Sequence, residues 1–278
     1  NIKMKYKYIC AIILLCSSLS IYAQKKIVIL HTNDTHSRID PMPETDKYNP
    51  GQGGVVNRKA IIDSIRQVEE NVLLIDAGDF VQGTPYYNLF KGRVEAETMN
   101  LMEYDVTTIG NHEFDYGLDT LKMVFETLNF PVLNCNYDFS NTVLKDLVKP
   151  YLILNRFGLK IGLIGVGAKP DGLVQKEKYE GMIFNPIVES VNYYAQLLKR
   201  KEKCDLVICV SHIGYLEDKV LADNSHYLDL IIGGHSHTFM KQPDMRTNLD
   251  GKSVMVYQVG KNAVSIGKIE IDLKKVKK

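Results

Sequence analysis

The chain has 278 residues, of which 45% are hydrophobic and 24% charged, and its formal net charge at pH 7 is +1. This composition fits a globular protein with one large α/β domain or two small ones. The near-neutral charge gives no general attraction to nucleic acid or to a membrane surface, so we expect neither as a partner. An anionic ligand would have to be bound locally, for example through metal ions.

The first 23 residues have the pattern of a secretory signal peptide. Three lysines among the first seven residues form a basic start, residues 9–15 are apolar, and Ala23 supplies the small residue that a signal peptidase requires. The apolar run is shorter than the ~20 residues needed to span a bilayer. We therefore expect translation to start at Met4, with a signal peptide over 1–23. The mature chain, 24–278, would be periplasmic or secreted and have no integral membrane span.

Two alternatives to cleavage stay open. The apolar segment could be retained as an amphipathic anchor, or Cys16 could carry a lipid, although the bulky Leu15 precedes it where a lipoprotein signal prefers a small residue.

Three of the cysteines, Cys135, Cys204 and Cys209, follow the signal segment, and this odd number argues against a disulfide framework. The last two border or lie in an apolar run without CxxC spacing, which predicts buried thiols that bind no metal.

Apolar runs of strand length alternate with helically spaced segments along the rest of the chain. In the first half we expect strands over 27–30, 72–75, 106–109 and from 132, and helices over 57–70, 95–102 and 118–128. In the second half we expect a helix over 187–200 and strands over 160–166, 206–210, 228–232, 254–259 and 264–273. Prolines at 41, 43 and 50 indicate an exposed loop between the first strand and the first helix. The alternation predicts a single α/β domain.

Five of these strands end in clusters rich in Asp, His and Asn. The clusters are HTNDTH at 31–36, DAGD at 76–79, GNHEFD at 110–115, SHIG at 211–214 and GGHSH at 233–237. In open α/β sheets, ligands bind beyond the carboxyl ends of the strands. We therefore expect the five clusters to converge on one site.

Two of the clusters are weak signals on their own. Asp34 and His36 offer a carboxylate and an imidazole at alternate positions of an extended turn, from which both could reach one ion. A capping Asp in a turn explains the same pattern. Asp79, which lies between Gly78 and Gly83, could bridge two ions about 3.5–4 Å apart, or could cap the N-terminus of a helix.

The GNHEFD cluster is more specific. Asn111 offers an amide oxygen to a cation, and Asp115 lies three residues after His112, where it can orient the imidazole if the segment turns helically. We expect Glu113 either to point outward or to support the ligands from behind, without a catalytic role.

Three histidines at two strand ends complete the set. His212, His235 and His237 lie beside glycines that permit close approach, whereas His31 and His226 lack this context and are interpreted as structural. Carboxylate and imidazole together suit Zn, Fe, Mn or Co better than Ca.

In this order, the motifs resemble those of the calcineurin-like metallophosphoesterases. HTNDTHSRID, DAGDFVQGTP, GNHEFDYG and GGHSHT are similar to the 5′-nucleotidase family in particular, which includes UDP-sugar hydrolases and 2′,3′-cyclic phosphodiesterases. The resemblance covers nearly the whole mature chain. It implies the metallo-dependent phosphatase fold, an α/β four-layer sandwich of two mixed β-sheets flanked by helices.

The resemblance also assigns seven residues to two divalent metal ions, Zn or else Mn or Co. One ion would be held by Asp34, His36 and His237, the other by Asn111, His212 and His235, and both by Asp79. The catalytic pair, which stabilises charge on the phosphoryl oxygens or on the leaving group, would be His112 and Asp115.

The implied activity is hydrolysis of phosphate monoesters, with nucleoside 5′-phosphates as the expected substrates. Hydrolysis of cyclic nucleotides, nucleotide sugars or thiosulfate esters stays open, as does a non-catalytic role as a metal-binding periplasmic protein. The family's nucleotidases continue into a second, substrate-binding domain, whereas this sequence ends at Lys278. We expect a separate polypeptide to supply that domain.

Overall fold

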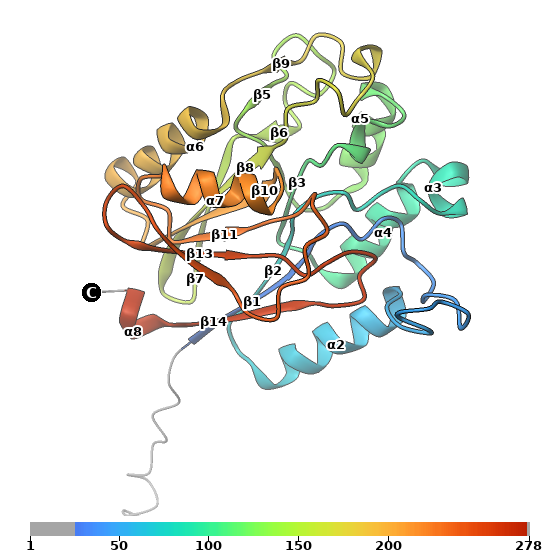
Figure 1. The fold of residues 1–278 in the computed structure, drawn as a ribbon, viewed down its shortest axis with the longest axis horizontal. Helices are drawn as coiled ribbons and strands as arrows, with labels where there is room; N and C mark the ends of the chain where they lie inside the picture. The colour runs from blue at the N-terminus through green and yellow to red at the C-terminus, as the bar shows by residue number, and fades with distance from the viewer. Residues whose placement is uncertain (1–25, 277–278) are drawn as a thin grey trace, which may run out of the picture.

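Two six-stranded sheets lie at the centre of the computed structural model, which describes residues 26–276 (Figure 1). The first sheet has the strand order β14 (Gly267–Asp272), β1 (Lys26–Thr32), β2 (Val72–Asp76), β3 (Val106–Thr108), β4 (Val132–Leu133) and β6 (Val148–Lys149). The second has the order β12 (Asp244–Thr247), β13 (Ser253–Tyr257), β11 (Leu230–Ile232), β10 (Leu206–His212), β8 (Leu159–Gly167) and β7 (Tyr151–Arg156). A short antiparallel pair is formed by β5 (Tyr137–Asp138) and β9 (Ile183–Phe184).

Both sheets are mixed, as expected. In the first, β14 is antiparallel to β1 and the other neighbours are parallel. In the second, the edge strands β7 and β12 are antiparallel to their neighbours, and the inner strands are parallel.

Helices cover the outer face of each sheet (Figure 1). The first sheet is covered by α2 (Val55–Val68), α3 (Pro85–Phe90), α4 (Arg93–Met102) and α5 (Leu118–Thr127). The second is covered by α6 (Ile187–Gln196), its π-helical continuation Leu197–Lys201, and α7 (Tyr215–Asp223). The remaining helical segments are the 3₁₀ turns His112–Phe114 and Lys176–Lys178 and the short α8 (Leu273–Val276). Within residues 26–276, no helix has the length and apolar character needed to cross a bilayer.

Alternate residues of the central strands pack in different core layers, because successive side chains of a strand point to opposite faces. In β1, Ile27 and Ile29 pack between the two sheets, together with Ile208 of β10. Val28 and Leu30 pack on the other face, under the helices of the first half. A third core lies between the second sheet and the helices α6 and α7. The chain therefore forms the four-layer sandwich expected from its sequence.

The two sheets come close together at Gly165 of β8. A Cβ at this position would overlap the backbone oxygen of Leu133 in β4, so a side chain of any size would push the sheets apart.

The cysteines of the described residues are not paired. Cys204 and Cys209 are buried and, like Cys135, form no disulfide bond. Burial raises the pKa of Cys209 well above its usual value, and the position agrees with the buried thiol expected there.

The sequence predicted most of the regular structure but missed some elements. The helices expected over 57–70, 95–102 and 118–128 are present with ends shifted by one or two residues, and the loop with its three prolines is largely exposed. The helices α3 and α7 and the edge strands β7 and β12 were not expected. The signal segment expected over 1–23 lies outside the described residues.

Candidate metal centre

The five clusters do converge, and the convergence joins the two sheets. Loops after β1, β2 and β3 of the first sheet meet the end of β10 and the loop after β11 of the second. Side chains from both sheets form two compact groups with the composition of metal sites. This placement follows the general rule that ligands bind beyond the carboxyl ends of parallel strands.

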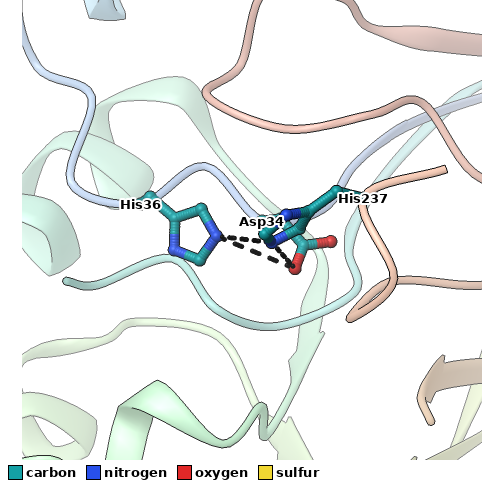
Figure 2. Close-up of side chains that lie close together, drawn as sticks. All are labelled: Asp34, His36 and His237. Atoms are coloured by element: carbon teal, nitrogen blue, oxygen red, sulfur yellow. Dashed lines mark hydrogen bonds and ion pairs between the residues drawn. The ribbon is translucent and has the colours of Figure 1, made fainter. Parts of the chain in front are cut away.

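The first group consists of Asp34, His36 and His237, whose ligand atoms all lie within 4.8 Å of one another. Nε2 of His36 lies 3.0 Å from Nε2 of His237, and Oδ1 of Asp34 lies 3.9 Å from the first of these nitrogens and 3.3 Å from the second. Figure 2 shows both imidazoles turned toward the carboxylate. One carboxylate oxygen and two imidazole nitrogens around one point are a typical set for a divalent transition metal.

The second group consists of Asp79, His212 and His235, again with ligand atoms within 4.8 Å. Nε2 of His212 lies 3.1 Å from Oδ2 of Asp79, and Oδ1 of Asn111 lies 2.7 Å from Nδ1 of His235. The two groups adjoin, since Oδ1 of Asp34 lies 3.9 Å from Nε2 of His212. All seven residues predicted as ligands are thus brought together, while their role as ligands stays a prediction.

His212 shows that a cation fits the second group. It is fully buried, and its Nδ1 lies 2.6 Å from the backbone oxygen of Ala77, to which it donates. In the neutral ring Nε2 would then carry the lone pair, and its buried neighbour Oδ2 of Asp79 can only accept, so this pair of atoms lacks a cation or a proton between them. In the chain alone, burial opposes a charged ring, but Asp79 and then Asp34 outweigh it and raise the pKa of His212 to about 10. The surroundings therefore favour a positive charge here, which a divalent ion would supply.

His112 and Asp115 form the pair expected from the sequence. The 3₁₀ turn that begins at His112 brings Asp115 back, so that Nδ1 lies 3.1 and 3.3 Å from the two carboxylate oxygens. The backbone N–H of His112 donates to Oδ1 of Asp79 at 2.9 Å, and its ring centroid lies 5.5 Å from that of His36. Burial opposes protonation of His112, but the bond to Asp115 and the charge of Asp79 outweigh it and raise the pKa.

Glu113 supports the ligand loops from inside the protein. It is only 3% exposed, so the expectation that it could point outward is wrong. Its carboxylate accepts hydrogen bonds from the backbone N–H groups of Gly110 (2.6 Å), Asp79 (3.0 Å) and Phe80 (2.9 Å). It therefore ties the loop of Asp79 to the loop that begins the GNHEFD cluster.

Two further polar side chains hold ligand loops and were not singled out in the sequence. Nδ2 of Asn33 donates to Oδ2 of Asp34 at 2.6 Å. Asp76 accepts from the hydroxyls of Thr32 (2.7 Å) and Thr107 (3.0 Å), and burial raises its pKa to about 6. Both lie inside the HTNDTH and DAGD clusters, where a buried polar residue next to a proposed ligand could have marked them.

Five of the seven proposed ligands have left-handed backbone conformations. They are Asp34 (φ 50°), His36 (φ 47°), Asp79 (φ 55°), His235 (φ 73°) and His237 (φ 53°). The extended turn expected around Asp34 is therefore wrong, and these five side chains converge because the backbone turns sharply at each of them. Such conformations cost about 1–3 kcal/mol each in non-glycine residues and cluster at functional sites. The capping alternative for Asp79 is also wrong, since α3 has Thr84 as its N-cap.

The other two histidines lie outside both groups. His31 is fully buried in β1, with its ring centroid 5.0 Å from that of Tyr257. Nδ1 of His226 lies 2.7 Å from Oδ1 of Asp250 on the surface. Both positions agree with the structural interpretation.

Comparison with known proteins shows the family of the chain. The calcineurin-like phosphoesterase family matches residues 27–239. The snake venom 5′-nucleotidase of Crotalus adamanteus is 33% identical over 264 residues, which cover 87% of this chain and 45% of that protein. The chain spans between 40% and 47% of the length of eight such curated relatives.

Solved structures agree with this placement. The 5′-nucleotidase precursor of Thermus thermophilus superposes with a TM-score of 0.82 at 31% identity, over 88% of this chain and 51% of that one. The NAD nucleotidase of Haemophilus influenzae superposes with a TM-score of 0.81 at 28% identity, over 88% and 47%. Because the family match spans most of the chain and includes all five strand-end clusters, this protein belongs to the calcineurin-like phosphoesterase family.

Proposed function

We propose that this chain is a phosphomonoesterase that acts on nucleoside 5′-phosphates with two divalent ions, Zn or else Mn or Co. The observation that carries the proposal is the pair of adjoining ligand groups in one site. The similarity of the chain to proteins named 5′-nucleotidases supports nucleoside 5′-phosphates as the substrate class. The first ion would be held by Asp34, His36 and His237, the second by Asn111, His212 and His235, and both by Asp79.

The chain's own contribution to the chemistry centres on His112. When bound, the two ions would activate water for attack and neutralise charge on the phosphoryl group. The carboxylate of Asp115 accepts a hydrogen bond from Nδ1–H and so fixes the imidazole ring, which leaves Nε2 available to a substrate. Because the pKa of His112 is raised, its imidazole can carry a proton on Nε2. It can then donate a hydrogen bond, or that proton, to the substrate oxygen on which negative charge develops. A purely structural metal site needs no such pair, which weighs against a non-catalytic metal-binding protein.

Diester and pyrophosphate substrates form the second candidate class. The likeness to a protein named NAD nucleotidase favours nucleotide diphosphates, the class that includes nucleotide sugars. Cyclic nucleotides and thiosulfate esters stay alternatives, because the same ligand set would serve for them.

The test is hydrolysis by the purified mature chain, 24–278, with added Zn²⁺, Mn²⁺ or Co²⁺. AMP, an aryl phosphate, UDP-glucose and a 2′,3′-cyclic nucleotide would be compared, with Asp79→Ala and His112→Ala as controls. Metal-dependent release of phosphate from the two monoesters, lost in both variants, is the expected result. A folded protein that binds two ions and hydrolyses neither monoester would refute the proposal, and turnover of the diesters alone would establish the second class.

Export and a partner belong to the same proposal. A signal peptide over 1–23 predicts that the secreted protein begins at residue 24, which the intact mass of the exported chain would show. A lipid on Cys16 would instead add the mass of acyl chains. The separate polypeptide with the second, substrate-binding domain stays a prediction, and failure of any such polypeptide to co-purify with the chain or activate it would count against it.

A further inference from the structure

A buried amide outside the proposed ligand set contacts the loop 233–238, which carries two of the histidines. Gln258 follows β13 and is fully buried. Its Nε2 donates to the backbone oxygen of Gly234 at 2.9 Å. Its Oε1 accepts from the hydroxyl of Ser236 at 3.0 Å and from the backbone N–H of Thr238 at 3.3 Å. Gln258 therefore bonds to the residues on both sides of each histidine.

The orientation of this amide is fixed by a buried carboxylate. Oδ2 of Asp218, in α7, accepts from Nε2 of Gln258 at 3.2 Å, and its Oδ1 accepts from the hydroxyl of Ser211 at 2.6 Å. Ser211 directly precedes the ligand candidate His212. The backbone oxygen of Gly234 and Oδ2 of Asp218 both accept from Nε2, whereas the backbone N–H of Thr238 donates to Oε1, so the NH₂ end of the amide faces Gly234. Both N–H groups of Gln258 then have acceptors, and its oxygen accepts two hydrogen bonds.

The first glycine of the GGHSH cluster is explained by the same contacts. A Cβ on Gly233 would overlap Oδ2 of Asp218 and would lie 2.9 Å from Nε2 of Gln258. The loop can approach the buried pair only with glycine at this position.

We propose that Gln258, oriented by Asp218, is a positioning residue for both metal ions. It holds the loop 233–238 in the curled form from which His237 reaches the first ligand group and His235 the second. Since one loop supplies both groups, loss of Gln258 weakens the binding of both ions. The inference rests on the metal sites of the proposed function but not on its substrate.

The test compares two buried amides of the full mature chain. Gln258→Met keeps the length of the side chain and removes its hydrogen bonds. The matched control is Asn248→Leu: Asn248 is buried in the turn between β12 and β13, where its Oδ1 accepts from the N–H groups of Asp250 (3.0 Å) and Lys252 (2.9 Å). Zn²⁺ and Co²⁺ affinities are measured by competition with a chromophoric chelator, together with the visible spectrum of the Co²⁺ protein.

Gln258→Met is expected to weaken the binding of both ions about 10- to 100-fold and to change the Co²⁺ spectrum. Asn248→Leu is expected to leave both readouts as in the wild type, even if its thermal stability falls. Wild-type affinities and spectrum in Gln258→Met would overturn the inference.

If Gln258→Met does not fold, the exposed Ser236→Ala removes one bond to the amide and should weaken metal binding about threefold to tenfold. Unchanged affinities in this variant would then overturn the inference. A wild-type chain that binds neither ion would refute the proposed function as well, whereas tight wild-type binding with unaffected variants would refute the positioning role alone.

Discussion

His31 should make the stability of the chain fall in mild acid. It is fully buried in β1, and neither of its ring nitrogens has a hydrogen-bond partner in the described structure. Burial lowers the pKa of His31 to about 3, against about 6.5 for an exposed histidine. The unfolded chain therefore binds a proton that the folded chain excludes. This difference lowers the free energy of unfolding as the pH falls from about 6.5 toward 3.

The size of the effect follows from the two pKa values. A folded pKa below the unfolded one means that the full stability is present above pH 6.5 and is lost as the pH falls. Between pH 7 and pH 5 the loss amounts to about 2 kcal/mol. His31→Leu has a similar volume, does not titrate, and removes two unpartnered polar atoms. We expect this variant to be as stable as the wild type at pH 7 or more stable by about 1 kcal/mol.

The assay is urea unfolding of the wild type and His31→Leu at pH 7, 6 and 5, with a chelator present so that the loss of metal ions does not contribute. Other titrating groups act equally in both proteins, so the difference in unfolding free energy isolates His31. That difference should shift in favour of the variant by about 2 kcal/mol between pH 7 and pH 5. A difference that does not change with pH would refute the reasoning, because it would mean that His31 can be protonated in the folded chain.

Catalysis, sheet packing and metal binding can each be tested separately. His112→Ala should lower kcat for an aryl phosphate by about 10²–10⁴-fold with little change in KM, and Asp115→Asn by less, in steady-state kinetics. Gly165→Ala should cost about 3 kcal/mol in urea unfolding. Gly172→Ala, whose Cβ would meet nothing within 4 Å, should cost only about 1 kcal/mol. Chelation should lower the Tm, and Zn²⁺ at about 100 times its Kd should restore about 2.7 kcal/mol for each site that it fills.

The central strands could be predicted from the sequence, because a strand that is buried on both faces of its sheet has a continuous run of apolar residues. The strands β1, β2, β8 and β10 have this pattern, and the sequence located all four. The edge strands β7 and β12 are partly exposed and lack it. Helix α7 was missed because Asp218 occupies a buried position on the stripe that would otherwise be apolar. A buried carboxylate cannot be recognised from periodicity, since its partners Ser211 and Gln258 lie outside the helix and only the folded chain brings them to it.

The candidate site was predictable in its residue types and not in its backbone. Asp, Asn and His after buried strands indicated the seven proposed ligands, and their placement agrees. The left-handed backbone depends on contacts between loops, such as those from the N–H groups of Asp34 and His36 to the backbone oxygens of Gly78 (2.9 Å) and Asp79 (3.0 Å). Gln258 was not singled out, because it follows a strand and only the folded chain brings it to the loop 233–238.

His237 allows the backbone strain to be separated from the loss of a ligand. Its side chain is 36% exposed, so its removal opens little buried volume, and its φ is 53°. A residue with a Cβ is disfavoured in this conformation by about 1–2 kcal/mol relative to glycine, and the greater freedom of glycine in the unfolded chain offsets about half of that. With a chelator present, His237→Gly should therefore be more stable than His237→Ala by roughly 0.5–1 kcal/mol in urea unfolding.

Both variants lose the same imidazole, so they should bind metal ions equally weakly, and only the backbone distinguishes them. If the alanine variant were as stable as the glycine variant, the loop 233–238 would not have the left-handed conformation at residue 237 in the chain without ions. The ions would then impose the left-handed conformation as they bind. In that case the hydrogen bonds of Gln258 and Glu113 would not be enough to preorganise the ligand loops, and the strain at the other four ligands would have to be assigned to metal binding as well.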